Sequence, residues 1–453
     1  TQHYSDQPYV VKTDDGAWLV AVTTAAGHEG AQGQHVITRR STDQGRTWGE
    51  AVPVEPGAGP EASYAAMLKL PSGRIYIFYN HNTDNLRWIM ADSPPYQHHR
   101  CTRVDSMGYH VAKFSDDHGR SWSAERLPLP VREMDIDRRN SYGGAVRFFW
   151  NVGRPFIHQG AAYVSLHKVG GFGDGFFTRS EGVLLRSPDL LTVTDPTKAT
   201  WETLPDGDFG LRTPPGGGPV AEEQCYTVLS DGTFFACYRS IDGHPVGAYS
   251  GDGGHTWTVP EYLRFPDGRR LKHPRAATFI WRCANGKYLY WFHHHGGHFI
   301  THRGGSIPYE DRNPAWLCGA VEITTPAGQR LKFSQPEVGL YDDDPFIRMS
   351  YPDMVEADGQ YYFTETQKNQ ARVHPMPTTL ITGLWQQLEA PGGLPGKGCV
   401  AAWEASQGPM PASLPFAIGE LLRRDWARAD YGTYDARAGL TVELWLRADQ
   451  VQP

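Results

Sequence analysis

The chain has little cysteine, no long apolar run and no marked excess of charge of either sign. Its 6 cysteines in 453 residues are too sparse for a disulfide scaffold, and no Cys-x-x-Cys pair occurs. No stretch approaches the roughly 18 consecutive apolar residues that a membrane span needs. The formal net charge of -7, from 43 basic and 50 acidic residues, provides no electrostatic footprint for nucleic acid. We therefore expect neither nucleic acid nor a membrane as a partner.

The cysteines are expected to be buried thiols, although Cys225 and Cys237 flank one predicted turn and can approach each other. The chain begins at Thr1 without a methionine, and we interpret it as a processed product whose export signal has been removed. A secreted or periplasmic protein is the expectation that follows.

Helical periodicity is nearly absent before Ile418–Trp426, whereas turn residues are abundant, with 50 Gly and 34 Pro. Aromatic residues make up 12% of the chain, enough for a large core. The composition therefore indicates an all-β fold rich in short strands and turns.

One octapeptide pattern, Ser-x-Asp-x-Gly-x-[Ser/Thr]-Trp, occurs three times. It reads STDQGRTW at 41–48, SDDHGRSW at 115–122 and SGDGGHTW at 250–257. The aspartate can accept backbone N–H bonds in a tight turn, the glycine at the fifth position tolerates positive φ, and the tryptophan can pack the turn onto a sheet. The pattern predicts three equivalent structural turns.

A second repeat is a hairpin signature, in which period-2 alternation surrounds a turn containing Gly. Its six copies are YVVKTDDGAWLVAV, AAMLKLPSGRIYIFY, FIHQGAAYVSL, YTVLSDGTFFACY, FIWRCANGKYLYWF and PDMVEADGQYYFTE. Strands at this spacing predict an all-β propeller of four-stranded antiparallel blades, with six blades or seven. The blades are expected to begin near residues 5, 60, 150, 220, 273 and 348.

The chain is expected to divide into a propeller at 1–385 and a C-terminal part at 386–453. Segment 384–415 is rich in Gly, Pro and Ala and is typical of a linker. Segment 435–449 alternates like a strand and resembles the opening strand of a laminin-G or concanavalin-like domain. These last strands either begin such a lectin-like domain or close the propeller.

The three octapeptides resemble the Asp boxes of the sialidase-like β-propellers. True sialidases need three arginines that clamp a carboxylate, a Tyr nucleophile paired with a Glu, and an Asp acid. Their first arginine sits in an Arg-Ile-Pro-type motif ahead of the first Asp box, where this chain reads HYSDQPYVVKTDDG without any Arg. HPRAAT at 273–278 and GRP at 153–155 are imperfect substitutes, so an exo-acting sialidase-like hydrolase is kept as the alternative function.

The chain also resembles the propeller-type polysaccharide lyases, namely ulvan lyases and rhamnose–glucuronate lyases. β-Elimination on a uronic acid needs His and Tyr as proton handlers and a cation that stabilises the carboxylate. The resemblance implies catalytic roles for five residues and contacts to substrate from four more. The catalytic residues are His81, His110, Tyr163, Arg179 and Tyr226, and the substrate contacts are Asn82, His167, Lys168 and Arg239. The expected function is therefore a lyase acting on an acidic polysaccharide.

In that mechanism Arg179 binds the uronate carboxylate, while Tyr163 or His110 takes the C5 proton. His167 competes with Tyr163 for its role, because alternation places both on one face of the predicted strand. Each of these side chains also has a purely structural explanation, since a Tyr in a propeller strand is commonly a core residue. A non-catalytic carbohydrate-binding propeller is the remaining alternative.

The segment WFHHHGGH suggests a metal site in the fifth blade. Its histidines, together with a cysteine, offer the imidazole and thiolate ligands that zinc prefers. The predicted set is His294, His298 and Cys283, with His273 and His302 as further candidates. The lyase resemblance implies no required cofactor and leaves room for a structural zinc or calcium ion.

Overall fold

A computed structural model of the chain describes residues 4–92, 100–103, 105, 108–173, 176–296, 312–343 and 347–389. The chain divides into two units, Thr1–Ala390 and Pro391–Pro453, and every described residue belongs to the first. The predicted lectin-like strand and most of the predicted linker lie outside the described residues. Among these residues, no helix is long and apolar enough to cross a membrane.

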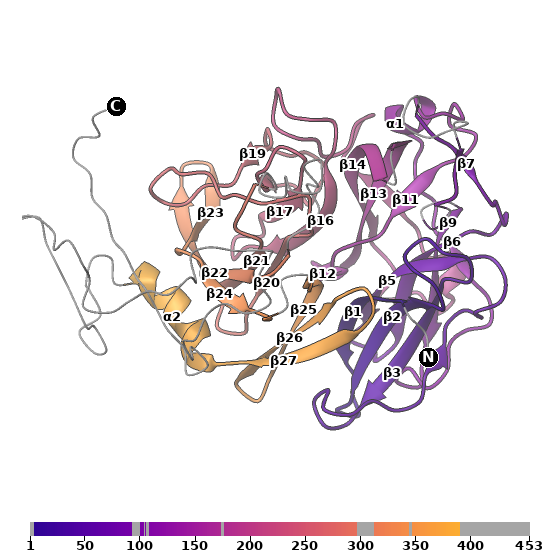
Figure 1. Cartoon of the computed structure of the whole chain (residues 1–453), viewed down its shortest axis with the longest axis horizontal. Coiled ribbons are helices and arrows are strands. Elements are labelled where there is room, and N and C mark those ends of the chain that lie inside the picture. The colour runs from indigo at the N-terminus through magenta and orange to yellow at the C-terminus, as the bar shows by residue number, and fades with distance from the viewer. Residues whose placement is uncertain are drawn as a thin grey trace, which may run out of the picture. The chain divides into compact units, whose positions relative to one another are not determined.

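Six antiparallel sheets form a ring around a central axis (Figure 1). Blades one and two, from the axis outward, are β1 (Tyr4–Lys12), β2 (Trp18–Ala25), β3 (His35–Ser41) and β4 (Val52–Pro53), then β5 (Ala62–Lys69), β6 (Ile75–His81), β9 (Tyr109–Ser115) and β10 (Leu127–Pro128). Blade three combines β11 (Phe148–Trp150), β12 (Phe156–His158), β13 (Ala161–Gly173), β14 (Phe176–Ser187) and β15 (Glu202–Leu204). Blade four contains β16 (Glu222–Val228), β17 (Phe234–Arg239), β18 (Val246–Ser250) and β19 (Glu261–Tyr262).

Blade five contains β20 (Phe279–Arg282), β21 (Tyr288–Phe292), β22 (Ala315–Thr325), β23 (Gly328–Phe333) and β24 (Glu337–Leu340). Blade six contains β25 (Ser350–Ala357), β26 (Gln360–Thr366) and β27 (Ala371–Met376). A small separate sheet pairs β7 (Ile89–Met90) with β8 (Arg100–Cys101). The helices are α1 (Asp135–Arg138), the 3-10 turn η2 (Pro196–Lys198) and α2 (Thr378–Glu389). The prediction of a propeller is confirmed, with six blades.

The ring closes by contact of the first strand with the last blade. Strand β1 lies against β25 and β26, so the two ends of the propeller meet directly. The N–H of Val10 donates to Asp353 at 2.8 Å, and the hydroxyl of Thr364 donates to the carbonyl of Pro8 at 2.6 Å. These bonds join segments more than 340 residues apart in the chain.

The three Asp boxes share one hydrogen-bond pattern. Asp43 accepts from the N–H of Thr47 at 2.9 Å and from its hydroxyl at 2.6 Å, and the other two boxes repeat the pattern. Gly119 shows why glycine is needed here, because its φ is 80° and a Cβ would lie 2.5 Å from Leu19. The tryptophans pack between neighbouring blades, and Trp122 also donates to Thr38 at 3.0 Å.

A fourth box, which the sequence analysis missed, lies in blade three. Ser187 donates to Asp189 at 3.0 Å, and Asp189 accepts from the N–H of Thr200 at 2.9 Å and from its hydroxyl at 2.7 Å. Trp201 follows and packs against Phe78 of blade two. The pattern Ser-x-Asp and Thr-Trp is intact, but an insertion carrying η2 separates its two halves.

Helix α2 corrects the expectation of a linker from residue 384. Ile381, Leu384 and Trp385 are buried at helical spacing, and the indole N–H of Trp385 donates to the carbonyl of Tyr288 at 2.7 Å. The helix packs on β22, where Gly319 leaves room for Trp385. Tertiary packing of this apolar face, rather than the Pro- and Gly-rich composition that follows it, decides the structure of 378–389.

The strand register orients the two ends of the propeller. In blade one, Lys12 at the end of β1 pairs with Trp18, which pairs with Ser41 at the start of the first Asp box. In blade four, Val228 pairs with Phe234, which pairs with Ser250 of the third box. The Asp boxes therefore lie where the first strands end, and the starts of these strands lie at the opposite end of the axis.

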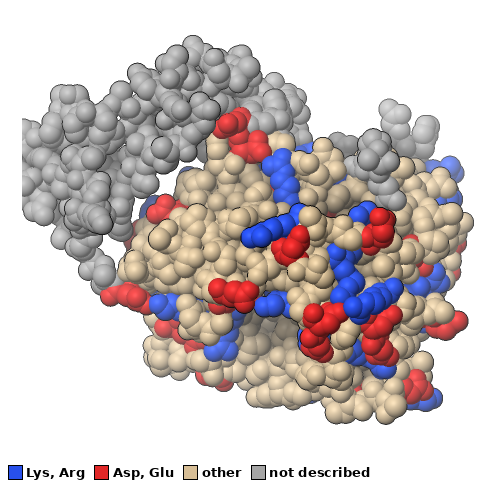
Figure 2. All heavy atoms as spheres, turned by 90° about the horizontal axis from the view of Figure 1, so that it is seen from below, with Lys and Arg blue, Asp and Glu red and all other residues tan. Residues whose placement is uncertain are grey.

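Charged side chains of both signs are mixed on the surface. Figure 2 shows one side of the molecule, where Lys and Arg side chains alternate with Asp and Glu. Oppositely charged side chains also pair with one another, since Asp15 contacts both Arg40 and Arg120 at 2.7 Å. This side carries no continuous patch of one sign.

Candidate active site

Charged side chains and one tyrosine meet near the axis at the end opposite the Asp boxes. This axial cluster comes from the starts of β16 and β25, the end of β17, and the segments that precede β20 and β22. Its members are Glu222, Glu223, Arg239, Arg275, Arg312 and Tyr351, and each is buried. Buried charges persist only when they are paired, so the cluster is a network rather than a set of independent groups.

Two bulges build the cluster. In a regular strand, successive side chains point to opposite faces. Glu223 has a φ of 58° and Tyr351 a φ of 46°, and both lie where the register of an innermost strand shifts. A positive φ at a non-glycine residue costs of order 1–3 kcal/mol. The bulges break the alternation, and Glu222 and Glu223 consequently reach the same guanidinium.

The pair of Tyr351 and Glu223 joins blade six to blade four. The Tyr351 hydroxyl donates to Glu223 Oε1 at 2.7 Å. Burial raises the pKa of Tyr351 well above its usual value, and the charge of Glu223 raises it further, although Arg239 and Arg312 act in the opposite direction. Burial also raises the pKa of Glu223. The phenol therefore stays protonated, with a carboxylate in position to accept its proton.

Two guanidinium groups neutralise the neighbouring carboxylates. Arg239 lies 2.6 Å from Glu222 and 2.8 Å from Glu223. Arg275 donates to Glu222 at 2.6 Å, and Arg312 donates to Ser350 at 2.7 Å. Burial alone would raise the pKa of Glu222, but Arg275 and Arg239 outweigh it and lower the pKa to about 2. Glu222 is therefore a permanent anion at neutral pH.

His167 supports the cluster from blade three. Its Nδ1 accepts the backbone N–H of Glu223 at 3.2 Å, so the proton of the neutral ring resides on Nε2. Burial lowers the pKa of His167 to about 3. Of the predicted substrate contacts, His167 and Arg239 thus lie in or against the axial cluster. Lys168 points to the other face of β13, where it pairs with the buried Asp137.

A second charged group lies beside the cluster, on its more exposed side. Glu29, in the loop between β2 and β3, contacts Lys368 at 3.2 Å and Arg103 at 3.5 Å. Lys368 also pairs with Asp6 at 2.7 Å, and Arg103 pairs with Asp105 at 2.8 Å. We call these five residues the mouth network. Asp6 lies in the segment where the sialidase resemblance leads one to expect an arginine.

His81 and His110 lie in blade two but on opposite faces of its sheet. His81 pairs across the sheet with Tyr109, the neighbour of His110. Cross-strand partners share a face and successive residues do not, so the two imidazoles point apart. Burial lowers the pKa of His81 to about 4 and that of His110 to about 3. The two rings therefore do not line one cleft. Asn82 caps the turn after β6 through Leu86.

Tyr163 and Tyr226 pack together in an apolar cluster between blades three and four. Tyr163 stacks on Phe156 at 4.9 Å, and Tyr226 lies 5.7 Å from Trp257 of the third Asp box. This position is toward the Asp-box end, away from the axial cluster. Arg179, in β14, donates to the carbonyls of Gly170 and Arg139. The five residues expected to catalyse elimination are therefore not brought together.

The predicted metal ligands do not meet as a set. Phe279 pairs with Trp291, so His294 lies beyond one end of the β20–β21 hairpin and Cys283 beyond the other. Four residues of extended strand already span about 13 Å, far more than one metal ion bridges. His298 and His302 lie outside the described residues, and within the described parts of the chain no three metal-ligating side chains converge. A site that combines His294 with Cys283 is excluded.

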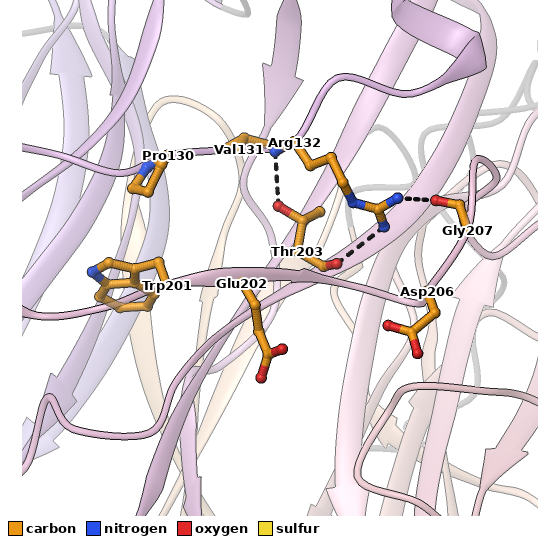
Figure 3. Close-up of a pocket in the computed structure, with 8 residues that line it drawn as sticks. All are labelled: Pro130, Val131, Arg132, Trp201, Glu202, Thr203, Asp206 and Gly207. Carbon is orange, nitrogen blue, oxygen red and sulfur yellow. Dashed lines mark hydrogen bonds between the residues drawn. The ribbon is translucent and has the colours of Figure 1, made fainter.

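A hollow of about 570 Å³ opens at the outer edge of blade three (Figure 3). Its lining consists of Pro130, Val131, Arg132, Trp201, Glu202, Thr203, Asp206 and Gly207. The Arg132 guanidinium donates to the carbonyls of Thr203 and Gly207 and is held against the wall. The hollow lies beside the fourth strand of the blade, far from the axis, and contains none of the axial cluster.

Neither Tyr351 nor Glu223, the centre of the site, is among the residues that the sequence predicts for it. Tyr351 stands one residue ahead of its hairpin pattern, in SYPDM, and Glu223 stands three residues ahead of its own, in EEQCY. Arg275 was noted in HPRAAT only as an imperfect substitute for a sialidase arginine. The available signal was an adjacent pair of glutamates at the start of an innermost strand, where a solvated surface turn would be the simpler explanation.

The chain matches one protein family and resembles several solved structures. Residues 16–363 match the family described as the BNR repeat-like domain. A solved protein of unknown function from Dyadobacter fermentans is 15% identical, with a TM-score of 0.54 over 82% of this chain and 94% of its own. None of the curated proteins matches the chain.

Two solved structures carry named activities. The leech intramolecular trans-sialidase, in complex with 2,7-anhydro-Neu5Ac, is 12% identical, with a TM-score of 0.55 over 84% of this chain and 69% of its own. The Trypanosoma rangeli sialidase, captured with 2,3-difluorosialic acid as a covalent intermediate, is 14% identical, with a TM-score of 0.54 over 85% of this chain and 56% of its own. At these identities the likeness establishes the fold.

Proposed function

The chain belongs to the family of BNR repeat-like domains, and on this premise we propose that it is a glycoside hydrolase acting on a sugar that carries a carboxylate. Tyr351 is the nucleophile, Glu223 is its base, and the cations around them hold the substrate carboxylate. The reaction class is the one expected from the sialidase resemblance.

The observation that carries the proposal is the 2.7 Å hydrogen bond from the Tyr351 hydroxyl to Glu223. A phenol is a weak nucleophile unless a base removes its proton. Glu223 accepts this hydrogen bond in a site where both groups are buried, so proton transfer to Glu223 can accompany attack by the phenolate oxygen. Sialidases are the glycosidases that use a tyrosine in place of a carboxylate nucleophile.

The cations explain how an acidic sugar would be recognised. Guanidinium groups bind carboxylates by paired, charge-assisted hydrogen bonds. Arg312 donates to the Ser350 hydroxyl at 2.7 Å and to the backbone carbonyl of Arg275 at 3.4 Å, which holds its guanidinium in the cluster. Arg239 and Arg275 are held by Glu222, which fixes their orientation.

The chemistry proceeds in two steps. The Tyr351 oxygen attacks the anomeric carbon, its proton passes to Glu223, and the glycosidic C–O bond breaks. Water then attacks the same carbon, the bond from that carbon to the Tyr351 oxygen breaks, Glu223 returns its proton to the Tyr351 oxygen, and the proton lost by water passes to solvent. A poor leaving group also needs a proton on its oxygen. The aryloxide of an aryl glycoside leaves without that proton. Hydrolysis of such a substrate therefore depends on attack by Tyr351 and not on an acid that protonates the leaving group.

Hydrolysis has more support than the β-elimination expected from the lyase resemblance. The five side chains expected to eliminate a uronate are spread over two faces of blade two and the apolar packing of blades three and four. The polar side chains that do lie close together are those of the axial cluster. A binding module would need no buried Tyr–Glu pair, which also favours an enzyme.

The test is turnover of aryl glycosides of acidic sugars by the wild type and by Tyr351→Phe. The substitution removes one oxygen, so the fold should persist while turnover falls at least about 10³-fold, as for loss of an essential nucleophile. Asp195→Ala, in the η2 turn, is the control and should keep full activity. Ultraviolet absorbance of a new conjugated double bond, measured on uronic-acid polysaccharides, would instead establish a lyase and contradict the proposal.

A further inference from the structure

In the mouth network, one carboxylate lies between two cations. Glu29 Oε2 is 3.2 Å from Lys368 Nζ, and Glu29 Oε1 is 3.5 Å from Arg103 Nη2. The two oxygens of a single carboxylate thus face two different cations. A carboxylate of a bound ligand would seek this same arrangement.

Each cation is held from behind by a second, buried carboxylate. Asp6 is 2.7 Å from Lys368 and also accepts the Tyr4 hydroxyl at 2.6 Å. Asp105 is 2.8 Å from Arg103 and accepts the Tyr64 hydroxyl. Asp6 and Asp105 are at most 2% exposed, whereas 24% of the Glu29 side chain is exposed. Glu29 is therefore the one carboxylate of the network that can leave while both cations keep a partner.

The loop that carries Glu29 is tied to blade two through its last residues, since Gln34 donates to Ser63 at 2.6 Å and accepts from the N–H of Ala62 at 2.9 Å. Residues 26–34 connect β2 to β3, and the hydrogen bonds next to Glu29 are local, from the N–H of Gly30 to Gln34 and from the N–H of Ala31 to His28, both at 2.9 Å. Gly30 has a φ of 78° and approaches Arg103 so closely that a Cβ would lie 2.4 Å from its side chain. The loop therefore packs against Arg103, one of the two cations that Glu29 contacts.

The network adjoins the nucleophile of the proposed function. Lys368 Nζ lies 4.4 Å from the centre of the Tyr351 ring. Glu29 and Tyr351 are close enough to interact electrostatically. A ligand that displaced Glu29 would therefore bring its carboxylate next to the hydroxyl that attacks the sugar.

We propose that Lys368 and Arg103 form a carboxylate-binding subsite and that Glu29 occupies it in the ligand-free protein as an internal competitor. The proposal rests on the proposed function for the identity of the ligand, an acidic monosaccharide. Exchange of Glu29 for the ligand carboxylate leaves the charge of the subsite unchanged, so neither Lys368 nor Arg103 is left unpaired. Asp6 and Asp105 keep the two cations in place throughout.

The experiment is calorimetric titration of the full chain with sodium N-acetylneuraminate and with sodium D-glucuronate. N-acetyl-D-glucosamine is the neutral probe. Glu29→Gln keeps the shape of the side chain and removes its charge, so affinity for at least one acid should rise about tenfold, because the competing occupant no longer has to be displaced. Glu50→Gln, which removes an exposed carboxylate from the surface, should leave both affinities unchanged.

Lys368→Met should weaken binding of the same acid about tenfold or more, and Lys368→Arg should retain it. The second variant keeps the test valid if the first fails to fold, which a thermal melt would reveal. Unchanged or weaker binding by Glu29→Gln would overturn the proposal. An equal gain for the neutral sugar would also overturn it, because the gain would then come from opening the loop rather than from freeing the cations.

Failure of this proposal is distinguishable from failure of the proposed function. Binding of free monosaccharides needs no turnover, whereas the proposed function is judged by hydrolysis in the wild type and its loss in Tyr351→Phe. Tighter binding in Glu29→Gln without any hydrolysis would support the subsite and reject the hydrolase. Hydrolysis with no response to Glu29→Gln would do the reverse.

Discussion

Glu222 shows at the residue scale how the site holds its charges. The carboxylate is fully buried between Arg239 and Arg275, whereas the Tyr351 hydroxyl donates to the neighbouring Glu223. Removal of one member of a buried ion network leaves the others uncompensated and costs about 3–5 kcal/mol. Glu222 therefore acts by positioning the two guanidinium groups rather than by chemistry of its own.

Glu222→Gln should lower the free energy of unfolding by about 3–5 kcal/mol at pH 7. The folded-state pKa of about 2 lies below the ordinary value of 4.5, so the stabilisation is present above pH 4.5 and is lost as the pH falls toward 2. The gap between wild type and variant should consequently narrow between pH 4.5 and pH 2. Urea titrations at several pH values measure it, with Glu50→Gln as the charge-matched control. A gap that stays constant with pH would contradict the assigned pKa.

At the residue scale, the sequence indicates which polar side chains belong to the site better than it indicates which of them contact one another. Arg239 and His167 were identified as polar residues of the inner strands, and they do lie at or against the axial cluster. Tyr351 and Glu223 were not found, because a hydrogen bond between residues 128 positions apart depends on two bulges with positive φ. No local sequence pattern predicts a bulge at a glutamate or a tyrosine. His81 and His110 failed to converge for the related reason that sheet register decides their faces.

The fourth Asp box shows that this turn tolerates an insertion between its aspartate and its threonine. Its hydrogen bonds match those of the other three, although an insertion carrying η2 separates Asp189 from Thr200. Closing a longer loop costs little additional free energy, since the entropy grows only with the logarithm of its length. The box can therefore persist wherever the aspartate and the Thr-Trp pair remain.

Asp189→Ala should destabilise the protein by about 2 kcal/mol, because it leaves the N–H of Thr200 and two hydroxyls without their acceptor. Thr194→Ala, at an exposed position of the same insertion, is the matched control and should change little. Thermal unfolding of both variants checks the prediction. Equal stability of Asp189→Ala and the control would show that the hydrogen bonds of Asp189 do not stabilise the protein.

Elements with strong local patterns were predicted and those set by packing were not. The six hairpins begin within a few residues of the expected blade starts, since period-2 alternation around a Gly turn is a local property. Helix α2 was taken for part of a linker, because only its contact with β22 distinguishes a short amphipathic segment from the loop that follows. The interrupted Asp box escaped because its spacing differs from that of the octapeptide.

At the scale of the whole molecule, the ring depends on contacts between its two ends. The hydroxyl of Thr364 donates to Pro8, and that of Thr366 donates to Ser5, so β26 holds β1 in place. In the closed ring the edges of the innermost strands face the axis, where the surrounding blades protect them. The axial cluster combines residues from blades four to six, so it forms where these three blades meet at the axis.

Thr364→Val should therefore destabilise the entire propeller rather than one blade. The substitution preserves shape but leaves the buried carbonyl of Pro8 without its donor, at a cost of about 1–3 kcal/mol. Circular dichroism and tryptophan fluorescence should report one shared transition at a lower temperature. Separate transitions for the two probes would contradict a cooperative ring. Thr324→Val, on the exposed part of β22, is the control.

The measurement that tests the central claim most directly is capture of the sugar on the protein. The wild type is incubated with 2,3-difluorosialic acid, an analogue whose electron-withdrawing fluorine slows breakdown of a glycosyl–enzyme bond, and is then digested and analysed by mass spectrometry. The account predicts an added fluorosugar on the peptide that contains Tyr351, with no label in Tyr351→Phe. An active wild type that stays unlabelled at Tyr351, or a Tyr351→Phe variant that still turns over an aryl glycoside, would contradict it.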